Sequence, residues 1–220
     1  MLLSEEKCFV FVHVQKTGGS TLSRLLEEAV PDARGVNPRH MTLGEAIERE
    51  RIPQDYFAFA FVRNPWDRLA SWYSMIDRAR RKRLDWETAS VQRRRFRQNP
   101  LYRYVLRQAP TFDDFVKNCA QPRVVDGVPY SFAKNQYDYL TGRDGRMLAD
   151  FVGRFEDLER DVGRLFEALG LPAPKVPRKN RTHRRHYSKL YTLETEEIVR
   201  QRFRRDIEAF GYVFERAPTY

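Results

Sequence analysis

The clearest structural signal in this chain is one turn, Val14-Gln15-Lys16-Thr17-Gly18-Gly19-Ser20-Thr21. It follows an apolar run over 9–14 and opens an amphipathic run over 21–30, which predicts a strand, a glycine turn and a helix. Such a turn leaves backbone N–H groups pointing one way, at the positive end of a helix dipole. One lysine and three hydroxyl groups strengthen the pattern, so the turn suits a phosphate or a sulfate.

The turn differs from the two best-known phosphate loops. A Walker A loop places its lysine after the last glycine, whereas Lys16 comes before Gly18 and Gly19. The turn also lacks the G-x-G-x-x-G spacing of dinucleotide-binding folds. The alternative interpretation is an ordinary glycine turn between a strand and a helix.

A second stretch favours the anion-binding interpretation. Residues 56–62 read YFAFAFV, which is typical of a buried parallel strand, and Arg63-Asn64-Pro65-Trp66-Asp67-Arg68 follows. Pro65 suits the first position of a helix, and Ser71 then lies about two turns into it. Ligands of open α/β sheets bind at the carboxyl ends of strands, where Lys16 and Arg63 both lie. A structural ion pair between Arg63 and Asp67 is the alternative.

These residues resemble a known family. Q-K-T-G-G-S-T together with F-V-R-N-P-W-D-R-L-x-S-x-Y is similar to the sulfotransferases that use 3′-phosphoadenosine 5′-phosphosulfate (PAPS). The nearest resemblance is to the branch of Golgi carbohydrate sulfotransferases and their bacterial relatives. Asp150–Glu156 resembles the third core segment of that family, and Tyr187–Phe214 resembles its terminal helix and tail. Gln15 departs from the pattern, because relatives often have proline there.

The resemblance implies a role for each matching residue. The first loop would bind the 5′-phosphosulfate, and Arg63 and Ser71 would bind the 3′-phosphate. Lys16 would also act in catalysis by neutralising the leaving phosphate, with adenosine 3′,5′-bisphosphate (PAP) as the product. The predicted cofactor-binding residues are Lys16, Thr17, Gly18, Gly19, Ser20, Thr21, Arg63, Ser71, Arg154, Arg181 and Tyr187. No metal is expected.

The attacking hydroxyl needs a base, and the chain has four histidines. His13 lies inside the first predicted strand, which favours a packed core histidine. His40 lies in the loop before a helix, and the resemblance implies that a histidine in this stretch is the base. An imidazole that titrates near neutral pH suits that role. A capping or surface role for His40 is the alternative, and Glu45 and Glu48 are weaker candidates for the base.

The net charge of +10 is concentrated in two segments. Residues 78–107 hold eleven Lys and Arg against two acids, Asp85 and Glu87, a balance of +9, with aromatic residues between them. Residues 178–189 hold six cations and no acid. We assign the second cluster to the cofactor and the first to an anionic acceptor or a partner surface. A solvated helix face is the alternative for both, and nucleic-acid binding is a further, less favoured one.

Composition favours a compact enzyme in a reducing compartment. Hydrophobic residues make up 41% of 220 residues, enough for a core, and no apolar run approaches the ~20 residues of a membrane span. The first predicted strand begins too early to leave room for a signal peptide. Cys8 and Cys119 form neither a disulfide framework nor a metal pattern, so both are expected in the core. We therefore expect a cytoplasmic protein.

The predicted fold is α/β and P-loop-like, with a central, mainly parallel sheet flanked by helices. We expect one domain over 1–220, with a basic helical insertion over 78–120 that lines the acceptor cleft. A further short strand is expected near 34–37 or 174–176. The predicted strands are 8–14, 56–62 and 149–154, and the predicted helices are 21–30, 42–50, 65–82, roughly 87–107, 111–119, 156–169 and 194–210.

The sequence thus predicts a sulfotransferase that moves the sulfuryl group of PAPS to a hydroxyl, with a carbohydrate as the expected acceptor. One alternative is a nucleotide kinase with a P-loop-like fold, against which the position of Lys16 argues. A second is a non-catalytic module that binds polyanions on the same fold.

Overall fold

A computed structural model describes residues 1–81, 100–119, 124–125, 128–129, 131–177 and 186–217. The chain divides into two compact units. The first comprises Met1–Asn64 and Asn135–His183, and the second comprises Pro65–Lys134 and Arg184–Tyr220. The predicted site residue Arg181 and the basic residues of 82–99 lie outside the described residues.

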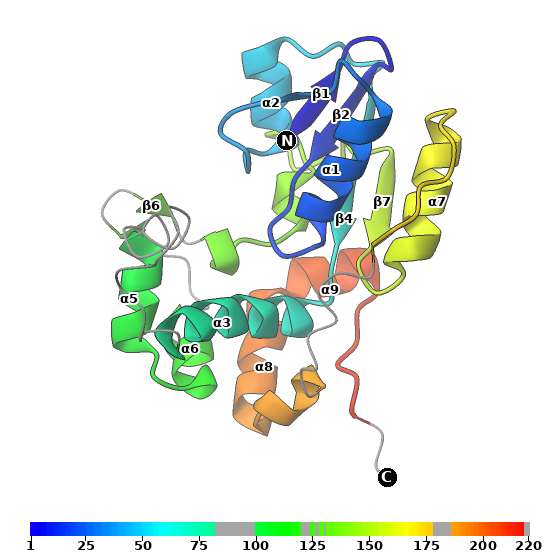
Figure 1. The fold of residues 1–220 in the computed structure, drawn as a ribbon. Helices are drawn as coiled ribbons and strands as arrows, with labels where there is room; N and C mark the ends of the chain where they lie inside the picture. The colour runs from blue at the N-terminus through cyan, green and yellow to red at the C-terminus, as the bar shows by residue number, and fades with distance from the viewer. Residues whose placement is uncertain (82–99, 120–123, 126–127, 130, 178–185, 218–220) are drawn as a thin grey trace, which may run out of the picture. The chain divides into compact units, whose positions relative to one another are not determined.

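The first unit is built on a five-stranded mixed sheet with the order β3-β1-β2-β4-β7 (Figure 1). The central strands β2, β4 and β7 run parallel, and β1 pairs antiparallel with β2 and β3. This arrangement confirms the predicted α/β class. The strands are β1 (Leu2–Ser4), β2 (Phe9–Val12), β3 (Arg34–Gly35), β4 (Phe57–Val62) and β7 (Phe151–Arg154).

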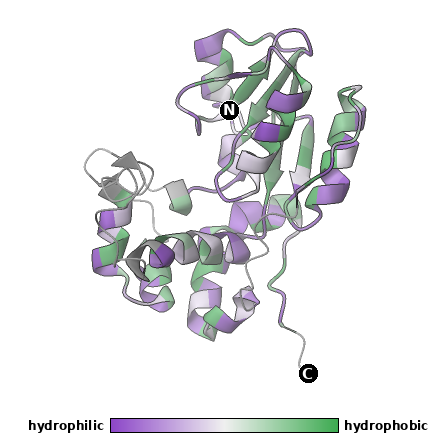
Figure 2. Ribbon diagram, in the orientation of Figure 1, coloured by the Kyte–Doolittle hydropathy of each residue, from purple (hydrophilic) through white to green (hydrophobic). Residues whose placement is uncertain are grey.

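Phenylalanines on one face of this sheet form the core of the first unit. Side chains of β2 and β4 pack there against α1 (Gly19–Ala29) and α7 (Leu158–Ala168), and the hydrophobic colour of these strands marks the core (Figure 2). Phe11 and Phe59 stack with ring centroids 5.5 Å apart. Alternating aromatic residues in neighbouring parallel strands place their rings on the same face, which explains this layer. The unit also contains α2 (Leu43–Glu50) and the 3₁₀ turn η2 (Tyr137–Tyr139).

The second unit is mainly helical. Its core joins α3, α5, α6 and α8 around buried side chains that include Trp66, Val105, Phe115 and Phe203. The described part of the predicted insertion, α5 and α6, therefore contributes to this core. The elements are α3 (Pro65–Arg81), α5 (Pro100–Gln108), α6 (Phe112–Cys119), β5 (Val124–Val125), β6 (Val128–Pro129), η1 (Ser131–Ala133), η3 (Tyr187–Leu190), α8 (Leu193–Arg202) and α9 (Arg204–Phe210).

Three expectations need correction. The strand predicted over 8–14 spans only Phe9–Val12, because Cys8 belongs to the turn over 5–8 and residues 13–14 lie outside the strand. Cys8 lies in that turn and is exposed, so its predicted core position is wrong, whereas Cys119 is buried as expected. The helix predicted over 194–210 is interrupted at the buried Phe203, whose backbone adopts φ −108° and ψ 27°. The extra short strand is β3, which confirms the expectation for 34–37.

No helix in the described part of the chain combines the length and the apolar character that crossing a membrane requires.

Candidate functional site

Three predicted cofactor ligands lie at the same edge of the sheet in the first unit. Lys16 follows the end of β2, Arg63 follows β4 directly, and Arg154 is the last residue of β7. The three strands are parallel, with Val12 beside Ala60 and Val62 beside Arg154. Their carboxyl ends therefore meet, which is where open α/β sheets bind ligands.

The glycine turn after β2 requires glycine at two positions. Gly18 has φ +85°, in the left-handed region, and it precedes the first residue of α1. A Cβ atom on Gly19 would lie 2.3 Å from Cδ2 of His13, so any side chain there collides with that ring. The two glycines thus fulfil different needs, one for backbone conformation and one for space.

Backbone N–H groups at the start of α1 remain available to a ligand. The N–H groups of Thr21 and Leu22 donate to the carbonyl of Gly18, at 2.9 and 3.2 Å. Those of Gly19 and Ser20 precede the first intrahelical bond and donate to no acceptor among the described residues. This first turn offers donors and the positive end of the dipole of α1, as the sequence predicted.

The hydroxyl groups of the turn differ in accessibility. Thr17 is buried, and its hydroxyl donates to the carbonyl of Val14 at 2.9 Å. This hydroxyl stabilises the turn, and the assignment of Thr17 to the cofactor stays a prediction. Ser20 is exposed and Thr21 is half-buried.

Arg63 links the two predicted anion-binding stretches. Its side chain donates through Nη1 to the carbonyl of Lys16 at 3.1 Å, and its guanidinium lies 3.9 Å from the centroid of the Phe155 ring. Only 9% of Arg63 is exposed. The contacts hold a planar cation between the end of β2 and the segment after β7, as stacking of guanidinium on an aromatic ring favours.

Sequence reasoning missed the residues that hold this edge in place. Gln136 is fully buried and bonds both backbone groups of Arg63, accepting from N at 2.8 Å and donating to O at 2.7 Å. Glu156 accepts from the backbone N–H of Asn64 at 2.7 Å, and the Tyr139 hydroxyl donates to Gln15 at 3.0 Å. A buried glutamine or tyrosine carries no local pattern that reveals a partner more than seventy residues away.

Two histidines and one arginine form a cluster beside the turn. Arg39 donates through Nε to Nδ1 of His13 at 2.9 Å, so His13 accepts at this nitrogen and is neutral. Burial, with the charges of His40 and Arg39, holds the pKa of His13 well below its usual value. His13 is thus the packed core histidine that the sequence favoured.

His40 has a different arrangement. Its Nδ1 lies 2.8 Å from the backbone carbonyl of His13, and the two rings meet edge to face with centroids 4.8 Å apart. Because a carbonyl only accepts, Nδ1 carries the proton, which leaves Nε2 of the neutral ring basic. Burial lowers the pKa of His40, the hydrogen bond to the carbonyl of His13 opposes this shift, and the charges of the N-terminus and of Arg39 add to it. His40 is therefore mainly neutral at pH 7.

The two alternative bases have structural partners. Glu45 accepts from the backbone N–H of Thr42 at 2.8 Å and completes the capping box of α2. Glu48 pairs with Arg143. The capping box also fixes the N-cap of α2, Thr42, two residues after His40.

The remaining predicted ligands lie elsewhere or make other contacts. The backbone N–H of Arg154 donates to Asp161 at 2.7 Å. Ser71 is half-buried in α3, and Tyr187 is buried and accepts through its hydroxyl from the backbone N–H of Glu215 at 2.7 Å. Ser71 and Tyr187 belong to the second unit, and their assignment to the cofactor stays a prediction.

Comparison with known protein families identifies the family to which this chain belongs. A sequence model described as the sulfotransferase family matches residues 1–213. The chain therefore belongs to the sulfotransferase family, and its reaction is sulfuryl transfer to an acceptor. No curated protein matches the chain significantly.

Proposed function

We propose that this protein transfers the sulfuryl group of PAPS to a hydroxyl of a carbohydrate acceptor, with His40 as the base. The observation that carries the proposal is the contact of Arg63 with the carbonyl of Lys16, because it joins the two anion-binding stretches at one sheet edge. Family membership supports sulfuryl transfer and disfavours the alternative of a nucleotide kinase.

The cofactor would lie across the carboxyl ends of β2 and β4. The free N–H groups of Gly19 and Ser20, with the charge of Lys16, would hold the phosphosulfate, and Arg63 would hold the 3′-phosphate. These donors are fixed before the ligand arrives, since Gln136 clamps the backbone of Arg63 and the glycines set the turn. Fixed donors stabilise charge that develops on a leaving phosphate at no cost of reorganisation.

In the transfer step, the acceptor oxygen would form a bond to sulfur while the bond from sulfur to the phosphate oxygen breaks. The electron pair of that bond leaves with PAP, whose new charge Lys16 and the turn would neutralise. Nε2 of His40 would take the proton of the acceptor hydroxyl. The protein thus mainly aligns the reactants and balances charge, as in phosphoryl transfer.

Calorimetric titration with PAP tests the cofactor assignment. Lys16→Ala and Arg63→Ala should each weaken binding roughly ten- to hundredfold, since a charge-assisted contact contributes about 1.5–3 kcal/mol. Arg34→Ala is the control, because Arg34 is half-exposed and pairs with Glu5 and Glu50. Unchanged affinity in folded Lys16 and Arg63 variants would remove these residues from the site.

A thermal-shift comparison separates the reaction classes. PAP should raise the melting temperature more than ATP does at the same concentration, because bound ligand stabilises the folded state by mass action. A larger shift with ATP would favour the kinase. Binding of PAP without turnover of any acceptor would favour the non-catalytic module.

A further inference from the structure

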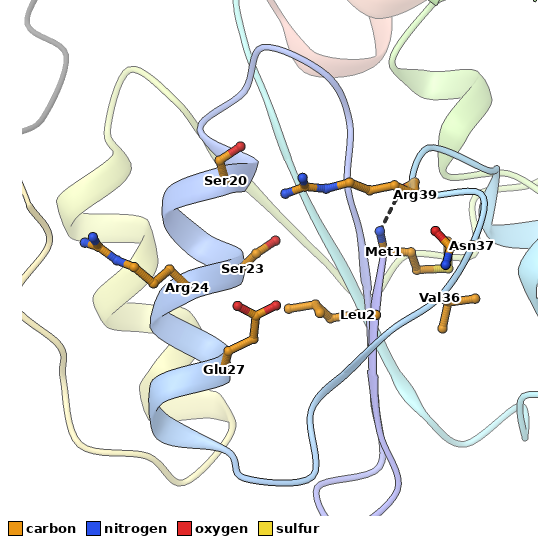
Figure 3. Close-up of a pocket in the computed structure, with 10 residues that line it drawn as sticks. Met1, Leu2, Ser20, Ser23, Arg24, Glu27, Val36, Asn37 and Arg39 are labelled. Atoms are coloured by element: carbon orange, nitrogen blue, oxygen red, sulfur yellow. Dashed lines mark hydrogen bonds between the residues drawn. The ribbon is translucent and has the colours of Figure 1, made fainter. Parts of the chain in front are cut away.

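A pocket of about 330 Å³ opens in the first unit between α1 and the segment 35–39 (Figure 3). Its volume lies at the lower end of the range of ligand sites, roughly 300–1,000 Å³. The buried side chains of Leu2 and Val36 supply apolar surface. The polar lining comes from Ser20, Ser23 and Glu27 of α1 and from Asn37 and Arg39 opposite.

The polar side chains of this pocket have few partners. Those of Ser20, Ser23, Glu27 and Asn37 form no hydrogen bond or ion pair with any residue that the structure describes. In Figure 3, Ser23 and Glu27 lie on the side of α1 nearer Leu2, whereas Arg24 points away. Arg24 instead lies 3.5 Å from Glu28, its neighbour one turn along the helix.

Arg39 brings an uncompensated charge to the pocket. Its one side-chain bond runs from Nε to the neutral His13, and among the described residues no carboxylate lies within ion-pair distance. Figure 3 shows its guanidinium extending toward the first turn of α1, where Ser20 lies. Both Nη groups are therefore available for the paired hydrogen bonds that arginine makes with a carboxylate or a sulfate.

We propose that this pocket is an acceptor subsite for a sugar unit that carries an anionic group, a carboxylate or a sulfate ester, bound by Arg39. The proposal rests on the function proposed above. Leu2 and Val36 would contact the face of the sugar ring, and Ser23, Asn37 and Glu27 would bond its hydroxyls. Ser20 and Arg39 connect the subsite to the cofactor turn and, through the next residue, to His40.

A matched pair of small probes tests the charge requirement. The dissociation constants of 4-nitrophenyl β-glucuronide and 4-nitrophenyl β-glucoside are measured by NMR titration of the full chain saturated with PAP. The glucuronide should bind about fivefold more tightly, the upper end for an ion pair that remains accessible to water. Arg39→Gln should remove this preference and Arg34→Gln should keep it, although both remove one positive charge from the same part of the chain.

Several results would overturn the subsite. They are equal affinities for the two glycosides, no detectable binding of either, a preference that survives in Arg39→Gln, and displacement of PAP by the glucuronide. Should Arg39→Gln fail to fold, Ser23→Leu fills the pocket and should abolish binding of both glycosides while PAP still binds. Failure of the wild type to bind PAP would instead count against the proposed function, so the two failures are distinguishable.

Discussion

Arg63, at the end of β4, and Arg39, in the loop before α2, are held by the protein in different ways. Arg63 is buried, stacks on Phe155, donates to the carbonyl of Lys16 and has both backbone groups bonded by Gln136. Arg39 is exposed, and its only side-chain hydrogen bond to a described residue is to His13.

This difference suits two kinds of ligand. A cofactor has a constant shape, so a cation fixed on several sides loses little freedom when the cofactor binds. An acceptor is recognised through one of several substituents, and a cation held at one point can adjust to it. We therefore infer that the β4 end serves PAPS and that the loop before α2 serves the acceptor.

Replacement of His40 should give the largest effect among the tests of these separate roles for the β4 end and the loop before α2. His40→Ala should lower turnover by ~10²–10⁴, the usual span for loss of a general base, because Nε2 no longer takes the proton. The affinity for PAP should stay unchanged, since His40 belongs to the loop before α2. Single-turnover kinetics with a working acceptor and calorimetry with PAP measure the two effects.

Normal turnover in this variant would show that His40 is not the base. Glu45 and Glu48 would be tested next, although both already have partners. A lower affinity of His40→Ala for PAP would contradict separate roles for the regions of Arg63 and Arg39.

Replacement of each arginine by lysine sharpens the comparison. Arg63→Lys should weaken PAP binding roughly tenfold or more, since a lysine keeps the charge but loses the planar stacking and the fixed fork. Arg39→Lys should change PAP affinity less than twofold, because this region does not contact the cofactor in our proposal. Equal losses in the two variants, measured by calorimetry, would contradict separate roles.

The clamp on Arg63 predicts a smaller effect, on stability. Gln136→Leu removes the two hydrogen bonds that Gln136 makes to the buried backbone of Arg63, and each bond lost should cost about 1–3 kcal/mol. Urea unfolding should show this loss. Gln201→Leu is the control, because the Gln201 amide bonds an exposed Glu197 and its removal should change the free energy of unfolding little. Equal losses of stability in the two variants would mean that the bonds from Gln136 to Arg63 stabilise the fold no more than an exposed hydrogen bond does.

Local patterns in the sequence predicted most of the framework. The apolar run 56–62 became β4, Thr111 caps α6 by accepting from Asp114, and Thr192 caps α8. These features depend on residues within one turn or one strand, so their signal lies in neighbouring letters. Cys8 was misplaced because a hairpin turn interrupts the chain where the apolar pattern continues.

The arrangement of the site could be predicted only in part. Strand ends placed Lys16 and Arg63 at one edge, because parallel strands bring their carboxyl ends together. The bond from Arg39 to His13 spans 26 residues, and the clamp of Gln136 on Arg63 spans 73. Such pairs depend on how distant segments of the chain meet in the fold. The sequence around Arg39 or Gln136 looks the same as that around a polar residue on a solvated surface.

The smallest expected effect concerns pH. Only neutral His40 can take a proton, and its pKa in the folded protein lies below the ordinary value of 6.5 because of burial and the charge of Arg39. The ratio kcat/KM, which reports groups of the free enzyme, should therefore rise with pH through a midpoint below 6.5. Arg39→Gln removes a nearby positive charge and should move the midpoint upward, toward 6.5. A midpoint above 6.5 in the wild type, or a downward shift in the variant, would mean that another group controls the rate.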